Sequence, residues 1–160
     1  MKVEFLGHAA FLITEESYTL LFDPFLTGNP LAAKKADEVK VTHIFVSHAH
    51  SDHLGDAIQI AKNSDATVYA VFEVAQIFEK EGIKVQAGNL GGRLPADFGS
   101  VKIFQAFHSS GVAGGSASGF VVELIGKKIY FAGDTALFGD MSLLESEEID
   151  LALLPIGDIY

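Results

Sequence analysis

The sequence of 160 residues contains no cysteine. Disulfides and thiolate ligands are therefore excluded, and any metal site must be built from histidine and carboxylate side chains. Basic residues are also few. There are 11 lysines and arginines against 21 aspartates and glutamates, which gives a formal net charge of −10. Basic clusters do not extend beyond pairs such as Lys34-Lys35, and this pattern argues against a nucleic-acid partner.

Long apolar runs are also lacking. None approaches the roughly 20 residues that a membrane-spanning helix needs, and the first residues, 1–5, do not resemble a secretory signal. Together with the missing cysteine, this predicts a soluble, cytoplasmic protein. Hydrophobic residues at 49% and charged residues at 20% are typical of globular proteins. We therefore expect one domain, residues 1–160, that buries most of its apolar surface.

Hydrophobic patterning predicts strands at both ends of the chain and an alternation of strands and helices between them. The expected strands are 3–6, 9–14, 18–22, 44–47, 67–70, 83–86, 100–107, 119–124, 128–132 and 151–154, and the expected helices are 56–62, 72–81 and 141–145. This order is typical of an α/β (α+β) protein in which stacked sheets are covered by helices.

The densest group of potential metal ligands is the segment His48-Ala49-His50-Ser51-Asp52-His53. It directly follows the apolar run 44–47, so it lies on a loop at the end of a buried strand, where catalytic groups are common. Three imidazoles and a carboxylate are too polar to be buried without partners, and zinc and similar metals bind such donors. We predict a metal site here. The alternative is a solvated polar loop that binds metal only incidentally.

The pattern His-x-His-x-Asp-His resembles the signature of the metallo-β-lactamase superfamily. Other segments match that superfamily in the expected order: an aspartate that ends an early strand, a lone downstream histidine and a Gly-Asp-Thr element. These are Asp23, His108 and 133–135. The opening segment 5–9 and the Leu-Leu-Pro-Ile-Gly-Asp segment 153–158 are similar to a group of bacterial and archaeal metal-dependent hydrolases related to ascorbate-6-phosphate lactonases.

The resemblance implies an αβ/βα sandwich that binds two divalent metal ions. The implied ligands are His48, His50 and His108 for the first metal, Asp52 and His53 for the second metal, and Asp134 as a bridge between them. Two ions about 3.5–4 Å apart share a hydroxide and polarise a carbonyl or phosphoryl oxygen. Zinc is the expected metal, and manganese, nickel and iron are alternatives for this set of donors.

Supporting roles follow for residues around these ligands. Asp23 is expected to brace the metal loop by accepting hydrogen bonds, and the alternative is a turn before the following proline. Thr135 is expected to orient the bridging aspartate. Catalytic contributions are expected from Asp52 and from His8, the latter as a substrate contact or proton shuttle, although a structural role for His8 fits equally well. His43, before the metal loop, is expected to be structural.

The expected function is hydrolysis of a small polar or anionic ester or lactone by a metal-bound hydroxide. Two divalent ions, the carboxylates of Asp52 and Asp134 and one hydroxide leave about one positive charge, which favours such substrates and stabilises a developing oxyanion. Superfamily members with a di-iron redox centre have glutamate where this chain has His50, so the resemblance implies hydrolysis. The alternatives are a small-molecule phosphodiesterase and a non-catalytic metal-binding module.

The metal-dependent hydrolases that this sequence resembles continue past the Leu-Pro-Ile-Gly-Asp element, and they carry a further histidine ligand near the C-terminal end. The resemblance therefore implies that the C-terminal part of the domain is missing from this sequence. We expect strand 151–154 to leave an apolar surface and the second metal to lack ligands, while the first site is complete. We expect a small-molecule substrate and a homo-oligomer, with neither nucleic acid nor membrane as a partner.

Overall fold

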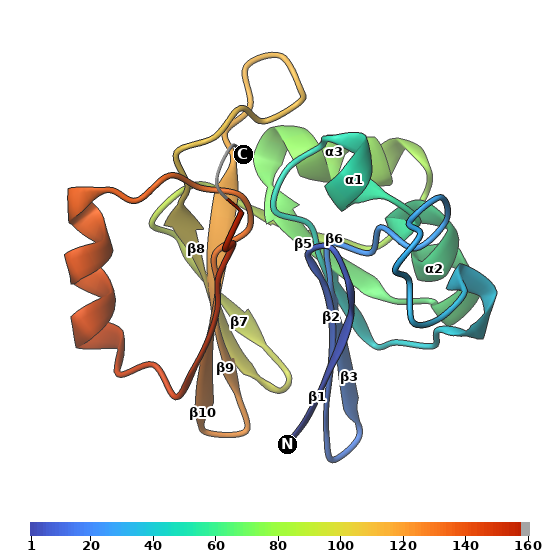
Figure 1. Ribbon diagram of the computed structural model, residues 1–160, viewed down its shortest axis with the longest axis horizontal. Helices are drawn as coiled ribbons and strands as arrows, with labels where there is room; N and C mark the ends of the chain where they lie inside the picture. Colours follow the sequence, from blue (N-terminus) through green and yellow to red (C-terminus); the bar gives the residue numbers. More distant parts are fainter. Residues whose placement is uncertain (158–160) are drawn as a thin grey trace.

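The computed structural model describes residues 1–157, so Asp158 of the segment 153–158 lies outside the described residues. Two β-sheets face each other, and helices cover their outer faces (Figure 1). The first sheet has six strands in the order β1-β2-β3-β4-β5-β6, and the second has five in the order β11-β10-β9-β8-β7. This arrangement is the predicted αβ/βα sandwich.

The first sheet begins as an antiparallel meander and continues with parallel strands. Its strands are β1 (Lys2–Gly7), β2 (Ala10–Glu15), β3 (Tyr18–Phe22), β4 (His43–Phe45), β5 (Thr67–Val71) and β6 (Val85–Gly88). Helices lie in the connections between the parallel strands: η1 (Ala36–Glu38), α1 (Ser51–Leu54), α2 (Ala57–Ser64) and α3 (Phe72–Lys80). The three α-helices cover the outer face of this sheet (Figure 1).

The second sheet is antiparallel except at one edge, where β11 runs parallel to β10. Its strands are β7 (Arg93–Ala96), β8 (Gly99–Gln105), β9 (Ser118–Leu124), β10 (Lys127–Phe131) and β11 (Leu151–Leu153). The 3-10 helix η2 (Gly139–Glu147) covers its outer face (Figure 1). Strand β7 was not predicted; it contains Pro95, which is tolerated because β7 is an edge strand.

Aromatic side chains pack between the two sheets, next to the ends of β3, β4 and β10. Phe22 stacks on Phe45 within the first sheet, with ring centroids 4.7 Å apart. From the second sheet, Phe131 lies 5.0 Å from Phe22 and Phe120 lies 5.5 Å from Phe45. Such pairs contribute about 0.5–1.5 kcal/mol each beyond their burial. The ends of β3, β4 and β10 are therefore held by a rigid core.

Strand β11 leaves an apolar surface, as the sequence predicted. Leu153 is buried, but Leu154 is 55% exposed and Ile156 is 96% exposed. Among residues 1–157, β11 pairs only with β10, so its second edge is open. The strand and its uncovered apolar side chains were therefore both predicted. Within the same residues, no helix is both long enough and apolar enough to cross a membrane.

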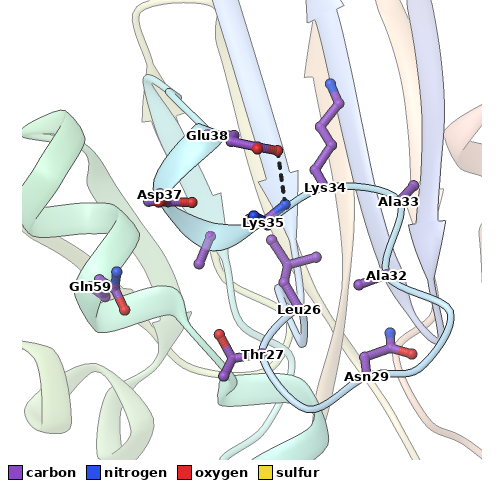
Figure 2. Close-up of a pocket in the computed structure, with 11 residues that line it drawn as sticks. Leu26, Thr27, Asn29, Ala32, Ala33, Lys34, Lys35, Asp37, Glu38 and Gln59 are labelled. Carbon is purple, nitrogen blue, oxygen red and sulfur yellow. Dashed lines mark hydrogen bonds between the residues drawn. The ribbon is translucent and has the colours of Figure 1, made fainter.

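The long connection between β3 and β4 borders a cavity of about 630 Å³ (Figure 2). Side chains of both signs line it, among them Lys34, Lys35, Asp37 and Glu38. The backbone nitrogen of Lys35 donates a hydrogen bond of 3.2 Å to Glu38 Oε2 (Figure 2). None of the predicted metal ligands lines this cavity, so it is separate from the predicted metal site.

Candidate metal centre

The predicted site residues meet at one edge of the sandwich. His8 follows β1, Asp23 follows β3, the segment 48–53 follows β4, His108 follows β8 and Asp134 follows β10. Strands β1, β3 and β4 point the same way within the first sheet, as do β8 and β10 within the second. Carboxyl ends of strands from both sheets therefore supply the site.

The metal loop is more regular than the sequence predicted. A helix was expected to begin after Leu54, but residues Ser51–Leu54 already form α1, with His50 in extended conformation at its N-terminal cap. Asp52 and His53 thus lie on a helical turn, not on a loop. The turn ends at Gly55, where φ is 44° and a side chain would collide with the Pro24 carbonyl. Such close approach needs glycine, and it fixes where α1 ends.

A first group of donors contains His48, His50 and His108, whose ligand nitrogens all lie within 4.8 Å of one another. His48 Nε2 is 3.0 Å from His50 Nδ1. Nitrogens bound to one tetrahedral zinc ion lie about 3.3 Å apart, so the spacing fits a shared ion. His48 Nδ1 faces Ser47 Oγ at 2.9 Å. This contact occupies Nδ1 and leaves Nε2 free for a metal.

A second group of donors contains His8, Asp52 and His53. Asp52 Oδ2 lies 3.2 Å from His8 Nε2 and 3.9 Å from His53 Nε2. The structure thus brings His8, expected only as a catalytic or structural residue, into reach of the second metal position. His53 Nε2 is buried and has no hydrogen-bond partner among the described residues. A buried nitrogen without a partner is costly, and metal coordination would satisfy it.

Asp134 connects the two groups. Its Oδ2 lies 3.2 Å from His53 Nε2, without hydrogen-bond geometry, and 3.8 Å from His108 Nε2. One carboxylate oxygen therefore faces donors of both groups, as expected for a bridging ligand. The preceding Gly133 has φ of 61°, and a Cβ there would lie only 2.7 Å from Ser47 Cβ. Glycine thus allows the Asp134 loop to pack against the metal loop.

Hydroxyl groups join the loops that carry the ligands. Thr135 Oγ1 accepts a hydrogen bond of 2.9 Å from the Phe107 backbone nitrogen, which ties the Asp134 loop to the loop of His108. Thr135 was expected to orient the aspartate; its hydroxyl contacts the backbone of Phe107 and Ala136, and the orienting role stays a prediction. Ser109 Oγ lies 3.2 Å from His50 Nε2.

Asp23 and Ser47 form a buried hub beneath the ligands. Asp23 accepts hydrogen bonds from the Ser47 backbone nitrogen at 2.8 Å, from Ser47 Oγ at 2.5 Å and from His53 Nδ1 at 2.7 Å. Ser47 in turn contacts His48. The hub therefore orients one histidine of each group. The sequence reasoning missed Ser47, although a serine at the end of an apolar run was a usable signal.

Burial makes His48 a neutral ligand. Burial is the largest cause that lowers the pKa of His48, to about 3. Repulsion from the charged forms of His53, His50 and His108 adds to this effect. The imidazole is therefore unprotonated at neutral pH. A metal ligand must be in this form.

His53 has the opposite behaviour. Burial alone lowers the pKa of a histidine, but the carboxylates of Asp134 and Asp23 outweigh it and raise the pKa of His53 to about 10. Burial likewise opposes ionisation of Asp134, yet His53 and the nearby histidines keep the pKa of that carboxyl below its usual value. Without a metal, the raised pKa therefore favours a protonated His53 beside the Asp134 carboxylate, and a metal ion competes with that proton.

Known proteins are similar to this chain in sequence and in fold. Residues 18–159 match the family described as "Beta-lactamase superfamily domain". The UPF0173 metal-dependent hydrolase of Symbiobacterium thermophilum is 50% identical over 164 residues, which cover 100% of this chain and 73% of the relative. The chain belongs to the metallo-β-lactamase superfamily. Within it, the chain belongs to the UPF0173 family of metal-dependent hydrolases, as does a relative from Thermus thermophilus at 48% identity over 100% of this chain and 73% of its own.

Solved structures agree with this family assignment. Igni18, a metallo hydrolase from Ignicoccus hospitalis, superposes with a TM-score of 0.88 at 30% identity, covering 99% of this chain and 71% of that protein. An isothiocyanate hydrolase from Delia radicum gut bacteria has a TM-score of 0.72 at 19% identity, covering 95% and 70%. The second likeness concerns the fold alone. The expected relation to ascorbate-6-phosphate lactonases stays a prediction.

Proposed function

We propose that this metal-dependent hydrolase cleaves a small polar or anionic ester or lactone, using two divalent ions held by the two groups of donors. One observation carries the proposal: Asp134 Oδ2 faces both His53 and His108, so that one carboxylate links the two groups. Bound ions would supply an activated water and polarise the carbonyl of the substrate. Zinc is the proposed metal.

The residues of the chain divide the work. His48, His50 and His108 bind the first ion, and the neutral state of His48 favours this without prior loss of a proton. Asp52 and His53 bind the second ion. The buried hub of Asp23 and Ser47 keeps Nε2 of His48 and His53 pointed at their ions by occupying the opposite ring nitrogens.

His8 and Asp52 form the accessible side of the centre. Their side chains are 40% and 44% exposed, whereas His48 and His53 are fully buried. A substrate can therefore reach His8 and Asp52 but not the buried ligands behind them. We assign His8 a substrate contact beside the second ion, with Asp52 Oδ2, 3.2 Å away, holding the ring in place.

The charge balance supports a polar or anionic substrate. Two divalent ions would exceed the charge of the two carboxylates, Asp52 and Asp134, so the filled centre keeps a positive charge that stabilises a developing oxyanion. The negative chain as a whole, at −10, opposes nucleic-acid binding. The homo-oligomer and the cytoplasmic location stay predictions.

A substrate panel tests the proposal. The protein is loaded with zinc, manganese, nickel or iron, its metal content is measured, and it is assayed on lactones, carboxylic esters, phosphodiesters and structured RNA. We expect turnover of esters and lactones that His48→Ala abolishes. Turnover of phosphodiesters alone would favour a phosphodiesterase, and cleavage of RNA without ester hydrolysis would refute the charge argument. Stoichiometric metal without any turnover would indicate a metal-binding module.

A further inference from the structure

His50 is a candidate ligand that the buried hub does not hold. The hub occupies Nδ1 of His48 and of His53. The ring of His50 has the reverse orientation: its Nδ1 lies 3.0 Å from His48 Nε2, within the first group of donors, and its Nε2 lies 3.2 Å from Ser109 Oγ. His50 would therefore bind the first ion through Nδ1, and its Nε2 needs a partner outside the hub.

Ser109 reaches His50 from the second sheet. It lies in the connection between β8 and β9, whereas His50 follows β4 of the first sheet. Two contacts bring this connection against the metal loop. The Ala49 backbone nitrogen donates a hydrogen bond of 2.7 Å to the Ser110 carbonyl, and a Cβ at Gly111, where φ is 73°, would lie 2.8 Å from His50 Cδ2. Such close approach needs glycine, so the backbone of the connection lies against the ring edge that carries Nε2.

The hydroxyl of Ser109 lies where it can accept the proton of Nε2. An imidazole that binds a metal through one ring nitrogen carries its proton on the other and donates it. His50 is half-buried, whereas His48 and His53 are buried, so water competes for this proton unless a protein group holds it. Among the described residues, Ser109 is the one hydrogen-bond partner of His50 Nε2. Ser109 therefore stands to His50 as Ser47 stands to His48.

We propose that Ser109 is a positioning residue of the first metal site: its hydroxyl accepts a hydrogen bond from Nε2 of His50 and keeps Nδ1 turned toward the ion. This proposal rests on the ligand set of the proposed function and adds a residue that does not itself bind the metal. Since Ser109 directly follows His108, one short segment of the second sheet supplies a ligand and orients another.

Zinc affinity tests this role without any turnover. Ser109→Ala removes the hydroxyl and keeps every ligand, so the affinity should fall about tenfold, as for other residues that orient ligands. Ser109→Thr keeps a hydroxyl and should retain the wild-type affinity. Ser116→Ala is the matched control, because Ser116 is exposed like Ser109, in the same connection, and has no hydrogen bond to a histidine within residues 1–157. Competition with a chromophoric chelator measures these affinities in the full chain.

A second measurement separates orientation of the ring from packing of the connection. In the zinc-loaded protein, the hydroxyl of Ser109 should protect the Nε2 proton of His50 from exchange with water, which NMR measures. This proton should exchange faster in Ser109→Ala, by up to about tenfold, and at the wild-type rate in Ser109→Thr. A weaker affinity without faster exchange would show that Ser109 only packs the connection against the metal loop, and would overturn the proposal.

The results also separate this proposal from the proposed function. Zinc binding that Ser109→Ala weakens, with faster exchange and without hydrolysis of any ester or lactone, would refute the proposed function and support the role of Ser109. Wild-type zinc affinity in Ser109→Ala would overturn that role, even where hydrolysis is intact. Equal weakening in Ser116→Ala would overturn it too, as would a loss in Ser109→Thr as large as that in Ser109→Ala.

Discussion

The two ends of strand β4 each carry a buried histidine, and the two histidines have different surroundings. His43 begins the strand, and His48 follows it after two intervening residues; their exposed fractions are 8% and 0%. Burial is the first cause that lowers the pKa of both. The two histidines therefore share residue type, strand and burial, and they differ in the side chains around them. Those side chains distinguish a structural histidine from a candidate metal ligand.

At the His43 end, both ring nitrogens already have partners. Nδ1 lies 2.9 Å from Thr42 Oγ1, and Nε2 lies 3.4 Å from Asp97 Oδ1. The ring packs against aromatic side chains, with the ring of Phe98 at 4.8 Å. No nitrogen is left for a metal. His43 is thus placed as a structural residue, in line with the expectation from sequence.

At the His48 end, the nearest rings are other histidines. The rings of His53, His50 and His108 lie 4.1, 4.6 and 4.9 Å from that of His48. Four imidazoles in contact would be difficult to satisfy by hydrogen bonds alone, because a neutral imidazole offers only one donor. The comparison teaches that a cluster of donors, not burial, marks a metal site. Substitutions at the two ends should therefore have opposite effects.

The largest effect is expected for His48→Ala. Loss of one ligand of the first metal should reduce turnover to background, while the chain stays folded because the aromatic core beneath the site is unchanged. Steady-state kinetics, metal analysis and circular dichroism measure the three quantities. Wild-type turnover with a full complement of metal would show that the ligand assignment is wrong.

Asp134→Ala and His53→Ala should separate the two metal positions. Asp134 faces both groups, so its loss should lower the occupancy of both metals, whereas loss of His53 should affect mainly the second. Zinc titration followed by calorimetry resolves the two events. Identical titration curves for both variants would argue against a bridging role for Asp134.

Ser47→Ala tests the hub that orients His48. The substitution removes the hydroxyl that lies between His48 Nδ1 and Asp23 Oδ2 but keeps every ligand. Metal affinity should fall about 10- to 100-fold, as for other residues that orient ligands. Ser64→Ala is the matched control near the His43 end, where the hydroxyl accepts only from the Val41 backbone nitrogen. Equal metal affinities for both variants would remove the special role of Ser47.

At the His43 end of β4, His43→Ala should lower the stability of the protein and leave turnover unchanged. The truncated ring leaves a space among Tyr18, Tyr69 and Phe98, and the free energy of unfolding should fall by about 2 kcal/mol. Urea denaturation of the metal-free protein measures the loss. A fall in kcat with unchanged stability would contradict the structural assignment and would erase the difference between the two ends of β4.

The smallest effect concerns pH. Burial lowers the pKa of His43 in the folded state, so below about pH 6.5 the unfolded chain binds a proton that the folded chain does not. Stability from this group is therefore present above that pH and is lost as the pH falls. The metal-free wild type should lose more stability on acidification than His43→Ala, by less than about 1.4 kcal/mol per pH unit. Parallel curves for the two proteins would refute the lowered pKa.

Sequence patterns could predict the site where its parts are adjacent in the chain. His48, His50, Asp52 and His53 lie within one segment after an apolar run, and both the resemblance and the chemistry of the donors indicated a metal. The same patterns could not show that Ser51–Leu54 is helical, because the end of this turn depends on the close approach of Gly55 to Pro24, which lies far from it in the sequence.

Contacts between the two sheets could not be predicted from the sequence. The rings of Phe11 and Phe131 pack across the two sheets, 6.4 Å apart, and Asp134 of the second sheet faces His53 of the first. No periodicity within one segment reports such pairs, since they depend on how the sheets are packed.

The division of the ligands between the sheets links metal uptake to folding. His48 and His53 follow β4 of the first sheet, whereas His108 and Asp134 follow strands of the second. The first group of donors is complete only when His108 from the second sheet joins His48 and His50, and the link by Asp134 also comes from the second sheet, so the full centre forms only after the two sheets have docked. An ion that binds the docked state and not the open one stabilises the docking itself, by an amount that grows with the logarithm of its concentration. The metal then links the two sheets of the sandwich. A chelator should therefore loosen the contact between the sheets before it unfolds either one.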